Sequence, residues 1–187
     1  MKKTIAIITS DPESINYEII KKSFFFFKKK NKNNYLFIGS KKLLQKVLKK
    51  NINFINIVDI KWSDNKKKYL EKSFEKFVDL YKKKKVHALI NLPLNKKDFF
   101  IGKYPGVTEY IADKFNCNQK ETMLLFNYSF SVSPITTHIK IKNIHKKISQ
   151  QKIITNFKNI INFYQKILHV KVPSVGILGL NPHSGID

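Results

Sequence analysis

Short apolar runs alternate with amphipathic stretches along the first hundred residues. Four of the runs are rich in β-branched and aliphatic side chains and end at polar residues, Gly or Pro, which is typical of buried strands. These runs are Thr4–Thr9, Tyr35–Ile38, Phe54–Val58 and Val86–Leu92. Between them, apolar residues recur at helical spacing and predict three helices. These helices cover about 15–27, Lys41–Lys49 and Tyr69–Tyr81.

Strands that alternate with helices favour an α/β fold with a mostly parallel sheet and flanking helices. Ligands of such sheets bind beyond the C-terminal ends of the strands. We therefore expect the chemistry of this chain in the segments 10–14, 91–97, 136–141 and 179–187.

The second half of the chain is less regular. Helical spacing predicts a short helix over Thr108–Phe115 and a long amphipathic helix over Gln150–Leu168. Strands are predicted over Met123–Phe126 and Phe130–Ile135, paired as a hairpin, and over Val175–Leu178. No Gly-x-Gly-x-x-Gly or Walker-type loop occurs, so the sequence gives no support to a conventional dinucleotide or P-loop site.

The charge of the chain changes this picture little. The formal net charge is +23, and all 36 basic residues are Lys. Proteins that read bases or grip phosphates bidentately rely on Arg. Lysine runs such as Lys66–Lys68 and Lys82–Lys85 fall at predicted helix ends or turns, where cations suit helix C-termini. We interpret the lysines as a solvated surface and expect no specific nucleic-acid partner; weak nonspecific binding is the alternative.

The location of the protein is also constrained. No apolar run approaches the roughly 18 to 20 residues of a membrane span, and the first ten residues lack the pattern of a secretory signal. Cys117 is the only cysteine, so neither a disulfide framework nor a cysteine zinc site forms within the chain. We expect a cytoplasmic protein with no membrane partner.

Two of the five histidines follow predicted strands at the edge where ligands are expected. These are His138 and His183, and neutral imidazole is a ligand that suits zinc and related divalent metals. Two histidines alone are weak grounds for a metal site, because most histidines are surface or satisfied core residues. His87, inside an apolar run, is expected in the core.

Five segments together resemble the 4-hydroxythreonine-4-phosphate dehydrogenase family of vitamin B6 biosynthesis. The most specific is the terminal stretch Gly179-Leu180-Asn181-Pro182-His183-Ser184-Gly185, and a second is Thr136-Thr137-His138-Ile139-Lys140. The other three occur in the family's order and approximate spacing. They are Ile8-Thr9-Ser10-Asp11-Pro12, Leu92-Pro93-Leu94-Asn95-Lys96 and Tyr104-Pro105-Gly106-Val107-Thr108-Glu109-Tyr110.

The resemblance implies the α/β/α architecture of isocitrate and isopropylmalate dehydrogenases. It also implies an NAD-dependent oxidation of 4-phosphooxy-L-threonine, followed by decarboxylation to 3-amino-2-oxopropyl phosphate. The family uses a divalent metal (Zn, Mg or Co) held by three histidines at a site shared within a homodimer. By position, His138 and His183 are two of those ligands and Thr108 contacts substrate.

Two further residues have both a functional and a plain interpretation. Lys96 could attract the substrate phosphate or carboxylate, or it could be one more surface lysine. Asp11 lies in the opening motif, but it could equally form a turn by capping the backbone that follows it.

The chain departs from the family pattern in three ways. The family's C-terminal portion, with the third metal histidine and most of the cofactor site, is not in these 187 residues. Val107 stands where the family has a substrate-binding histidine. Ser10, Ser14 and Asn16 replace glycines of the opening loop, and such side chains hinder a close approach of backbone to ligand.

These departures leave alternatives open. The chain is expected to be an incomplete dehydrogenase over 1–187, with an α/β core over 1–100 and with 101–187 entering a second subdomain. One alternative is a paralogue that acts on a 4-phospho-threonate or erythronate. Another is a non-catalytic remnant of the family.

Overall fold

A computed structural model describes residues 3–9, 11, 13–28, 34–95, 103–118 and 120–180 of the chain. They divide into two compact units, 1–110 and 111–187. No helix among these residues is long and apolar enough to cross a membrane.

The first unit is a parallel four-stranded sheet with the strand order β3-β2-β1-β4. Its strands are β1 (Thr4–Ile8), β2 (Asn34–Gly39), β3 (Asn56–Asp59) and β4 (Ala88–Asn91). Three helices connect them: α1 (Asn16–Lys28), α2 (Lys41–Leu48) and α3 (Lys66–Lys82), with the 3₁₀ helix η1 (Lys49–Phe54) after α2. The predicted α/β class with a parallel sheet is confirmed, and β3 begins two residues later than predicted because η1 takes up Phe54.

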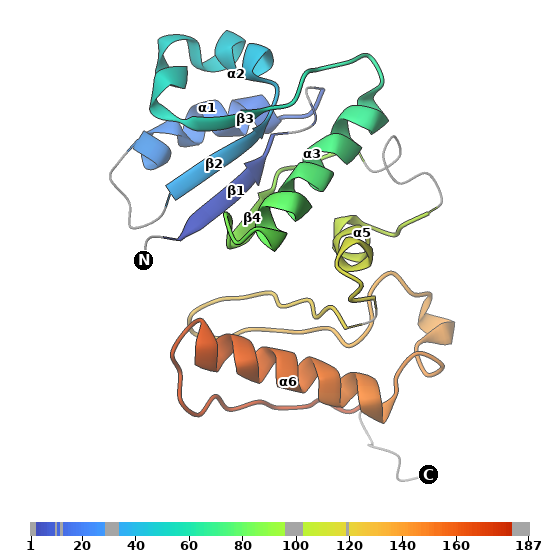
Figure 1. The fold of residues 1–187 in the computed structure, drawn as a ribbon. Coiled ribbons are helices and arrows are strands. Elements are labelled where there is room, and N and C mark those ends of the chain that lie inside the picture. Colours follow the sequence, from blue (N-terminus) through green and yellow to red (C-terminus); the bar gives the residue numbers. More distant parts are fainter. Residues whose placement is uncertain are drawn as a thin grey trace. The chain divides into compact units, whose positions relative to one another are not determined.

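Alternation along the strands sends side chains to two separate apolar layers. Ile7 and Phe37 pair in register and join a core with residues of α1, α2 and η1. The helical members of that core are Ile20, Phe24, Leu44, Leu48 and Ile52. Ile8 and Ile38 also pair, are fully buried, and point to the opposite face, where α3 lies (Figure 1).

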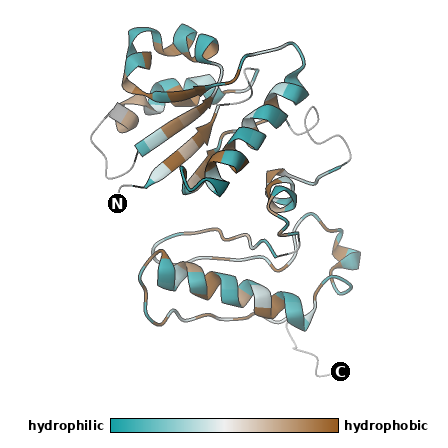
Figure 2. Ribbon diagram, viewed as in Figure 1, coloured by the Kyte–Doolittle hydropathy of each residue, from teal (hydrophilic) through white to brown (hydrophobic). Residues whose placement is uncertain are grey.

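Helix α3 covers that face with a buried stripe at helical spacing. Leu70, Phe74 and Phe77 are all buried. Figure 2 shows the same division, with hydrophobic strands inside and hydrophilic residues on the outer sides of the helices. The sheet is therefore covered on both faces, as parallel sheets require.

Side-chain caps fix where the connecting helices begin. Ser40 accepts a hydrogen bond from the Leu43 N–H at 3.4 Å, and Asn65 accepts one from the Lys68 N–H at 2.9 Å. Each cap satisfies a backbone donor that the first helical turn leaves free. These caps place the starts of α2 and α3 directly after the loops that leave β2 and β3.

The second unit contains α6 (Gln150–Lys166) and the 3₁₀ helix η2 (Ile141–Asn143), and α5 (Val107–Lys114) crosses the boundary between the units. The helices predicted over Thr108–Phe115 and Gln150–Leu168 correspond closely to α5 and α6. The hairpin predicted over 123–135 is reduced to one antiparallel bridge between Leu125 and Val132. The predicted strand Val175–Leu178 is wrong as well, because it pairs with none of the described residues.

Candidate functional site

The loops after β1 and β4 meet at the point where the order of strands reverses. The chain adds β2 and β3 on one side of β1 and then crosses to add β4 on the other side. In open parallel sheets this switch point is where ligands bind, because the loops there leave toward opposite faces. The site must therefore be built from the residues that follow these two strands.

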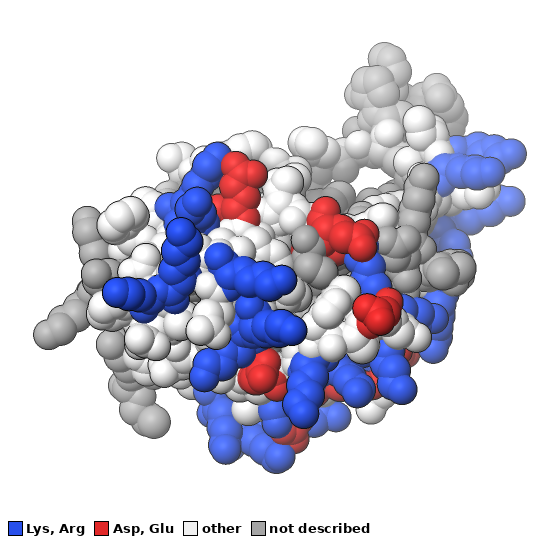
Figure 3. Space-filling view, turned by 90° about the horizontal axis from the view of Figure 1, so that it is seen from above, with Lys and Arg blue, Asp and Glu red and all other residues white. Residues whose placement is uncertain are grey.

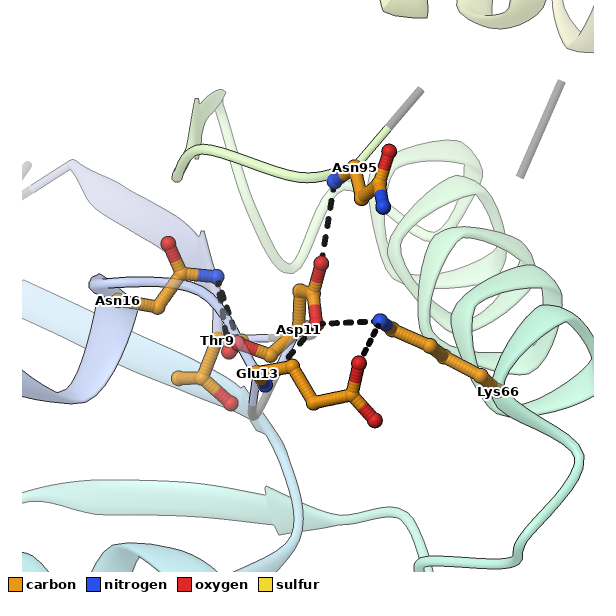
Figure 4. Close-up of polar contacts among 6 residues, drawn as sticks. All are labelled: Thr9, Asp11, Glu13, Asn16, Lys66 and Asn95. Atoms are coloured by element: carbon orange, nitrogen blue, oxygen red, sulfur yellow. Dashed lines mark hydrogen bonds and ion pairs between the residues drawn. The ribbon is translucent and has the colours of Figure 1, made fainter. Parts of the chain in front are cut away.

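Asp11 is the centre of this site (Figure 4). Its side chain is 1% exposed, and both carboxylate oxygens are occupied. Oδ1 accepts a hydrogen bond from the Glu13 N–H at 3.1 Å, and Oδ2 accepts one from the Asn95 N–H at 3.0 Å. The first bond is the turn-forming cap that the sequence allowed, and the second ties the loop after β1 to the loop after β4.

A lysine from α3 balances the buried carboxylate. Lys66 Nζ lies 3.3 Å from Asp11 Oδ1 and 2.7 Å from Glu13 Oε2. The Lys66 side chain is 14% exposed, whereas that of Glu13 is 74% exposed. A buried carboxylate without a cation would be costly, so Lys66 is the partner that makes Asp11 tolerable at this position.

Lys66 is a residue that sequence reasoning missed. The expectation that the lysine runs suit helix C-termini is wrong for Lys66–Lys68, which form the first turn of α3. Cations are disfavoured at that end of a helix dipole. This unfavourable placement of lysines is the feature of the sequence that could have pointed to Lys66. The ion pairs to Asp11 and Glu13 explain how Lys66 is accommodated in the first turn of α3.

The side chain of Asn16 stabilises the same loop through hydrogen bonds to its backbone. It is fully buried, and its Nδ2 donates to the carbonyl oxygens of Asp11 at 3.3 Å and of Thr9 at 3.5 Å. Its Oδ1 is buried and has no hydrogen-bond partner among the described residues. The Asn16 side chain therefore fills this loop and restrains its backbone.

A cluster of hydroxyl groups lies beside this loop, where β1 and β2 end. The Ser40 N–H donates to Tyr69 Oη at 2.7 Å. The Tyr17 hydroxyl is buried beside Thr9 and Tyr69 but forms no hydrogen bond of good geometry with a described residue. Burial raises the pKa of both tyrosines, and for Tyr17 the negative potential of Tyr69 adds to this effect.

Gly39 makes this packing possible. A Cβ atom at Gly39 would lie 1.9 Å from Thr9 Oγ1 and 3.2 Å from Tyr69 Oη. No side chain fits in that space, so the end of β2 must carry glycine for β1 and α3 to approach it.

The structure describes only two of the four predicted site residues. Thr108 is exposed in the first turn of α5, next to the half-buried Val107. His138 is exposed in the second unit, in a left-handed backbone conformation with φ of 56°. Lys96 and His183 lie outside the described residues. The convergence of these residues on one site therefore stays a prediction.

An exposed imidazole such as that of His138 fits the role of one metal ligand. Within the described ranges, no group of three His, Cys, Asp or Glu residues is close enough to hold a metal ion. His87, expected in the core, is instead exposed, and its Nδ1 accepts a hydrogen bond from the Thr4 N–H at 3.2 Å. It precedes β4 at the opposite end of the sheet from Asp11, so it is not part of the site.

These contacts define what Asp11 and Lys66 can do. Both oxygens of Asp11 are engaged, and Lys66 contacts two carboxylates, so neither group is arranged as a free base or acid. Their role is structural, because they hold the loops after β1 and β4 in one position. On the face shown in Figure 3, basic side chains are spread out, with acidic and uncharged side chains between them.

Comparison with known proteins identifies relatives for almost the whole chain. The model of the family described as pyridoxal phosphate biosynthetic protein PdxA matches residues 7–187. A 4-hydroxythreonine-4-phosphate dehydrogenase from a Sulfurihydrogenibium species is 30% identical over 96% of this chain and 63% of its own length. A putative D-threonate 4-phosphate dehydrogenase from Oceanobacillus iheyensis is 25% identical over 98% of this chain and 64% of its own length.

Solved structures have the same fold. The crystal structure of a 4-hydroxythreonine-4-phosphate dehydrogenase from Klebsiella pneumoniae matches with a TM-score of 0.80 at 23% identity, over 98% of this chain and 66% of the other. The corresponding enzyme from Burkholderia phymatum gives a TM-score of 0.77 at 22% identity, over 99% and 64%. The chain thus spans about three fifths of the length of the curated relatives that it matches first.

Proposed function

The chain belongs to the PdxA family of pyridoxal phosphate biosynthetic proteins, and from this premise we propose that it forms part of an NAD-dependent dehydrogenase. The proposed reaction oxidises the secondary alcohol of 4-phosphooxy-L-threonine. Loss of carbon dioxide from the resulting β-keto acid then gives 3-amino-2-oxopropyl phosphate. The observation that carries this proposal is the family match over residues 7–187.

His138 and His183 are the proposed metal ligands, and the resemblance implies a third histidine ligand outside these 187 residues. A bound Zn, Mg or Co ion would lower the pKa of the substrate alcohol and polarise the developing ketone. The exposure of His138 supports its part, because its ring is accessible to an ion from solvent. Both imidazoles would serve as neutral donors that orient the reacting end of the substrate.

Thr108 and Lys96 are proposed to bind the anionic groups of the substrate. Thr108 presents its hydroxyl in the first turn of α5, where backbone N–H groups and the helix dipole favour a phosphate or carboxylate. Lys96 would add a point charge. Asp11 and Lys66 are positioning residues in this scheme, because they hold the loop that leads from Asn95 into Lys96.

The function is tested by following NADH formation with 4-phosphooxy-L-threonine and a divalent metal. The chain is used together with the part of a relative that follows the matched residues. We expect His138→Ala to abolish turnover and to lower the metal content measured by mass spectrometry, whereas His145→Ala, another exposed histidine, changes neither. A folded, metal-loaded assembly without turnover would contradict the proposal.

Val107 favours a second candidate substrate. Val can neither donate a hydrogen bond nor carry charge, so a polar contact of the family is lost beside Thr108. Relatives from Oceanobacillus iheyensis and Fusobacterium nucleatum are named putative D-threonate 4-phosphate dehydrogenases. The comparison is kcat/KM for 4-phosphooxy-L-threonine against 4-phospho-D-threonate and erythronate. Val107→His should shift the ratio toward the first substrate; an unchanged ratio would remove Val107 as the determinant.

Assembly and location complete the proposal. A homodimer in the cytoplasm, with the small phosphorylated substrate as ligand and no specific nucleic-acid or membrane partner, remains our prediction. A chain that binds metal and substrate without turnover would instead match a non-catalytic member of the family.

A further inference from the structure

Asn16 is a fully buried polar residue at the first position of α1 (Figure 4). Its Nδ2 faces two carbonyl oxygens, those of Thr9 and Asp11. These acceptors fix the orientation of the amide, because an oxygen atom in the place of Nδ2 would meet two other acceptors. Oδ1 therefore points away from the loop, and it finds no donor among the described residues.

This geometry indicates that the Asn16 amide contributes little to the stability of the whole unit. Both of its hydrogen bonds are long, 3.3 Å to the Asp11 carbonyl and 3.5 Å to the Thr9 carbonyl. The buried Oδ1 atom without a donor lowers stability, because it has lost its hydration on folding. The two effects oppose each other, so the main consequence of the amide lies in the loop that it holds.

The amide completes a set of donors, from the residues that follow Asp11, that converge on this residue. The Glu13 N–H donates to the Asp11 carboxylate at 3.1 Å, and the Ser14 N–H donates to the Asp11 carbonyl oxygen at 3.2 Å. Asn16 Nδ2 is a second donor to that carbonyl oxygen. Because α1 contributes side chains to the buried core, the Asn16 amide ties the turn around Asp11 to a fixed element.

The direction of the Asp11 side chain in turn affects the loop after β4. Asp11 Oδ2 accepts a hydrogen bond from the Asn95 N–H at 3.0 Å, and Asn95 directly precedes Lys96 in the sequence. A side chain holds a partner precisely only where its own backbone and rotamer are fixed by supporting contacts. The contacts therefore connect the Asn16 amide, through Asp11, to the segment that leads into Lys96.

We propose that Asn16 is a positioning residue for the anionic substrate, because through Asp11 it holds the loop after β4 in the conformation that lets Lys96 bind a phosphate or carboxylate group. The identity of that group rests on the proposed function. The role of Asn16 goes beyond that function, since Asn16 contacts neither substrate nor metal in the proposed scheme. A residue of this kind affects the affinity for substrate far more than the stability of the fold.

The first test uses Asn16→Leu, which removes the amide but keeps a branched side chain of similar shape in the buried space. In the 187-residue chain, the midpoint of urea unfolding should stay close to that of the parent. The Asn95 amide should exchange with solvent at least about tenfold faster, as measured by nuclear magnetic resonance. The amides of Ile7 and Phe37, within β1 and β2, should exchange as in the parent and serve as the internal reference. Asn16→Ala should also accelerate exchange at Asn95, which would assign the effect to the lost amide and not to the new methyl groups.

The second test measures the affinity for 4-phosphooxy-L-threonine in the assembly that tests the proposed function. We expect Asn16→Leu to raise the dissociation constant and the KM about tenfold and to change kcat by less than about twofold. Ser73→Ala is the matched control. Ser73 is also fully buried and donates to a backbone carbonyl, that of Tyr69 at 2.9 Å, but it does so within α3. This variant should change neither the exchange of the Asn95 amide nor the affinity for substrate.

The inference is overturned if the Asn95 amide exchanges at the parent rate in both Asn16 variants. It is also overturned if the amides of Ile7 and Phe37 exchange faster together with it, because Asn16 would then only stabilise the fold. Faster exchange at Asn95 with an unchanged affinity for substrate would overturn the link to the substrate. Failure of the proposed function is a separate result, in which the parent assembly binds no substrate. The exchange of the Asn95 amide would then decide alone whether Asn16 positions the loop.

Discussion

Replacing the Asp11 carboxylate tests the central contact of the first unit. Asp11→Ala removes the acceptors of the Glu13 and Asn95 N–H groups and one carboxylate partner of Lys66. Each lost hydrogen bond costs about 1 kcal/mol, since both donors lie near solvent. Breaking a buried ion pair costs about 3–5 kcal/mol, but Lys66 keeps Glu13 at 2.7 Å, so the loss here should be about 1 kcal/mol. The expected decrease in the free energy of unfolding is about 3 kcal/mol.

The assay is urea unfolding followed by tryptophan fluorescence. Trp62 is the only tryptophan and its ring lies 4.8 Å from that of Tyr69, so it reports on the first unit. The midpoint should fall while the slope with urea stays constant, because the surface exposed on unfolding is unchanged. Asp11→Asn keeps one acceptor and should lose about half as much free energy.

Asp79→Asn is the matched control. Asp79 also forms a 2.7 Å ion pair, with Lys83, but both side chains are exposed. Such a pair contributes little, so the midpoint should stay close to that of the parent. If Asp11→Ala were as mild as Asp79→Asn, the contacts of Asp11 would not hold the two loops together, and the positioning role would be refuted.

Three further predictions concern the hydroxyl cluster at the ends of β1 and β2. Tyr69→Phe leaves the buried Ser40 N–H without its acceptor and should lower the free energy of unfolding by about 1–3 kcal/mol in urea unfolding. Tyr17→Phe should change it little, because the Tyr17 hydroxyl has no hydrogen-bond partner among the described residues. Because the folded pKa of Tyr17 and Tyr69 is raised above the unfolded value, their contribution is complete below about pH 10 and is lost as the pH rises further. Unfolding measured from pH 9 to 11 should therefore show a steeper decline for the parent than for Tyr17→Phe, and parallel curves would contradict this. Gly39→Ala should cost at least about 2 kcal/mol by the same urea assay, since its Cβ would overlap Thr9 Oγ1; a neutral result would mean that the two strand ends can separate.

The sequence predicts the first unit well because its local and tertiary preferences agree. The apolar runs around Ile7 and Phe37 match strands within one or two residues, and the stripe through Phe74 matches α3. What stays hidden is long-range pairing of polar groups. Neither helical nor strand periodicity could reveal that Asp11 meets Lys66 and the Asn95 N–H, since these contacts depend on the order of strands in the sheet.

The sequence predicts the second unit less well than the first. The run around Ile177 has the pattern of a strand, but a strand exists only where a neighbour supplies hydrogen bonds. The prediction that His87 is buried is also wrong. His87 precedes β4, which lies at the edge of the described sheet and not in its interior, so the residue stays exposed. Of the resemblance-based site residues, Thr108 and His138 are accessible, and their roles stay predictions.

The bond between Asp11 and Asn95 also bears on the order of events during folding. It joins residues that are 84 positions apart and can close only after β4 has entered the sheet beside β1. Loop-closure entropy delays such distant contacts, so the bond should be absent from the transition state. Loss of the Asp11 carboxylate should then accelerate unfolding and leave the refolding rate almost unchanged. The bond between the residues that follow β1 and β4 should therefore affect how long the native first unit persists rather than how fast it folds.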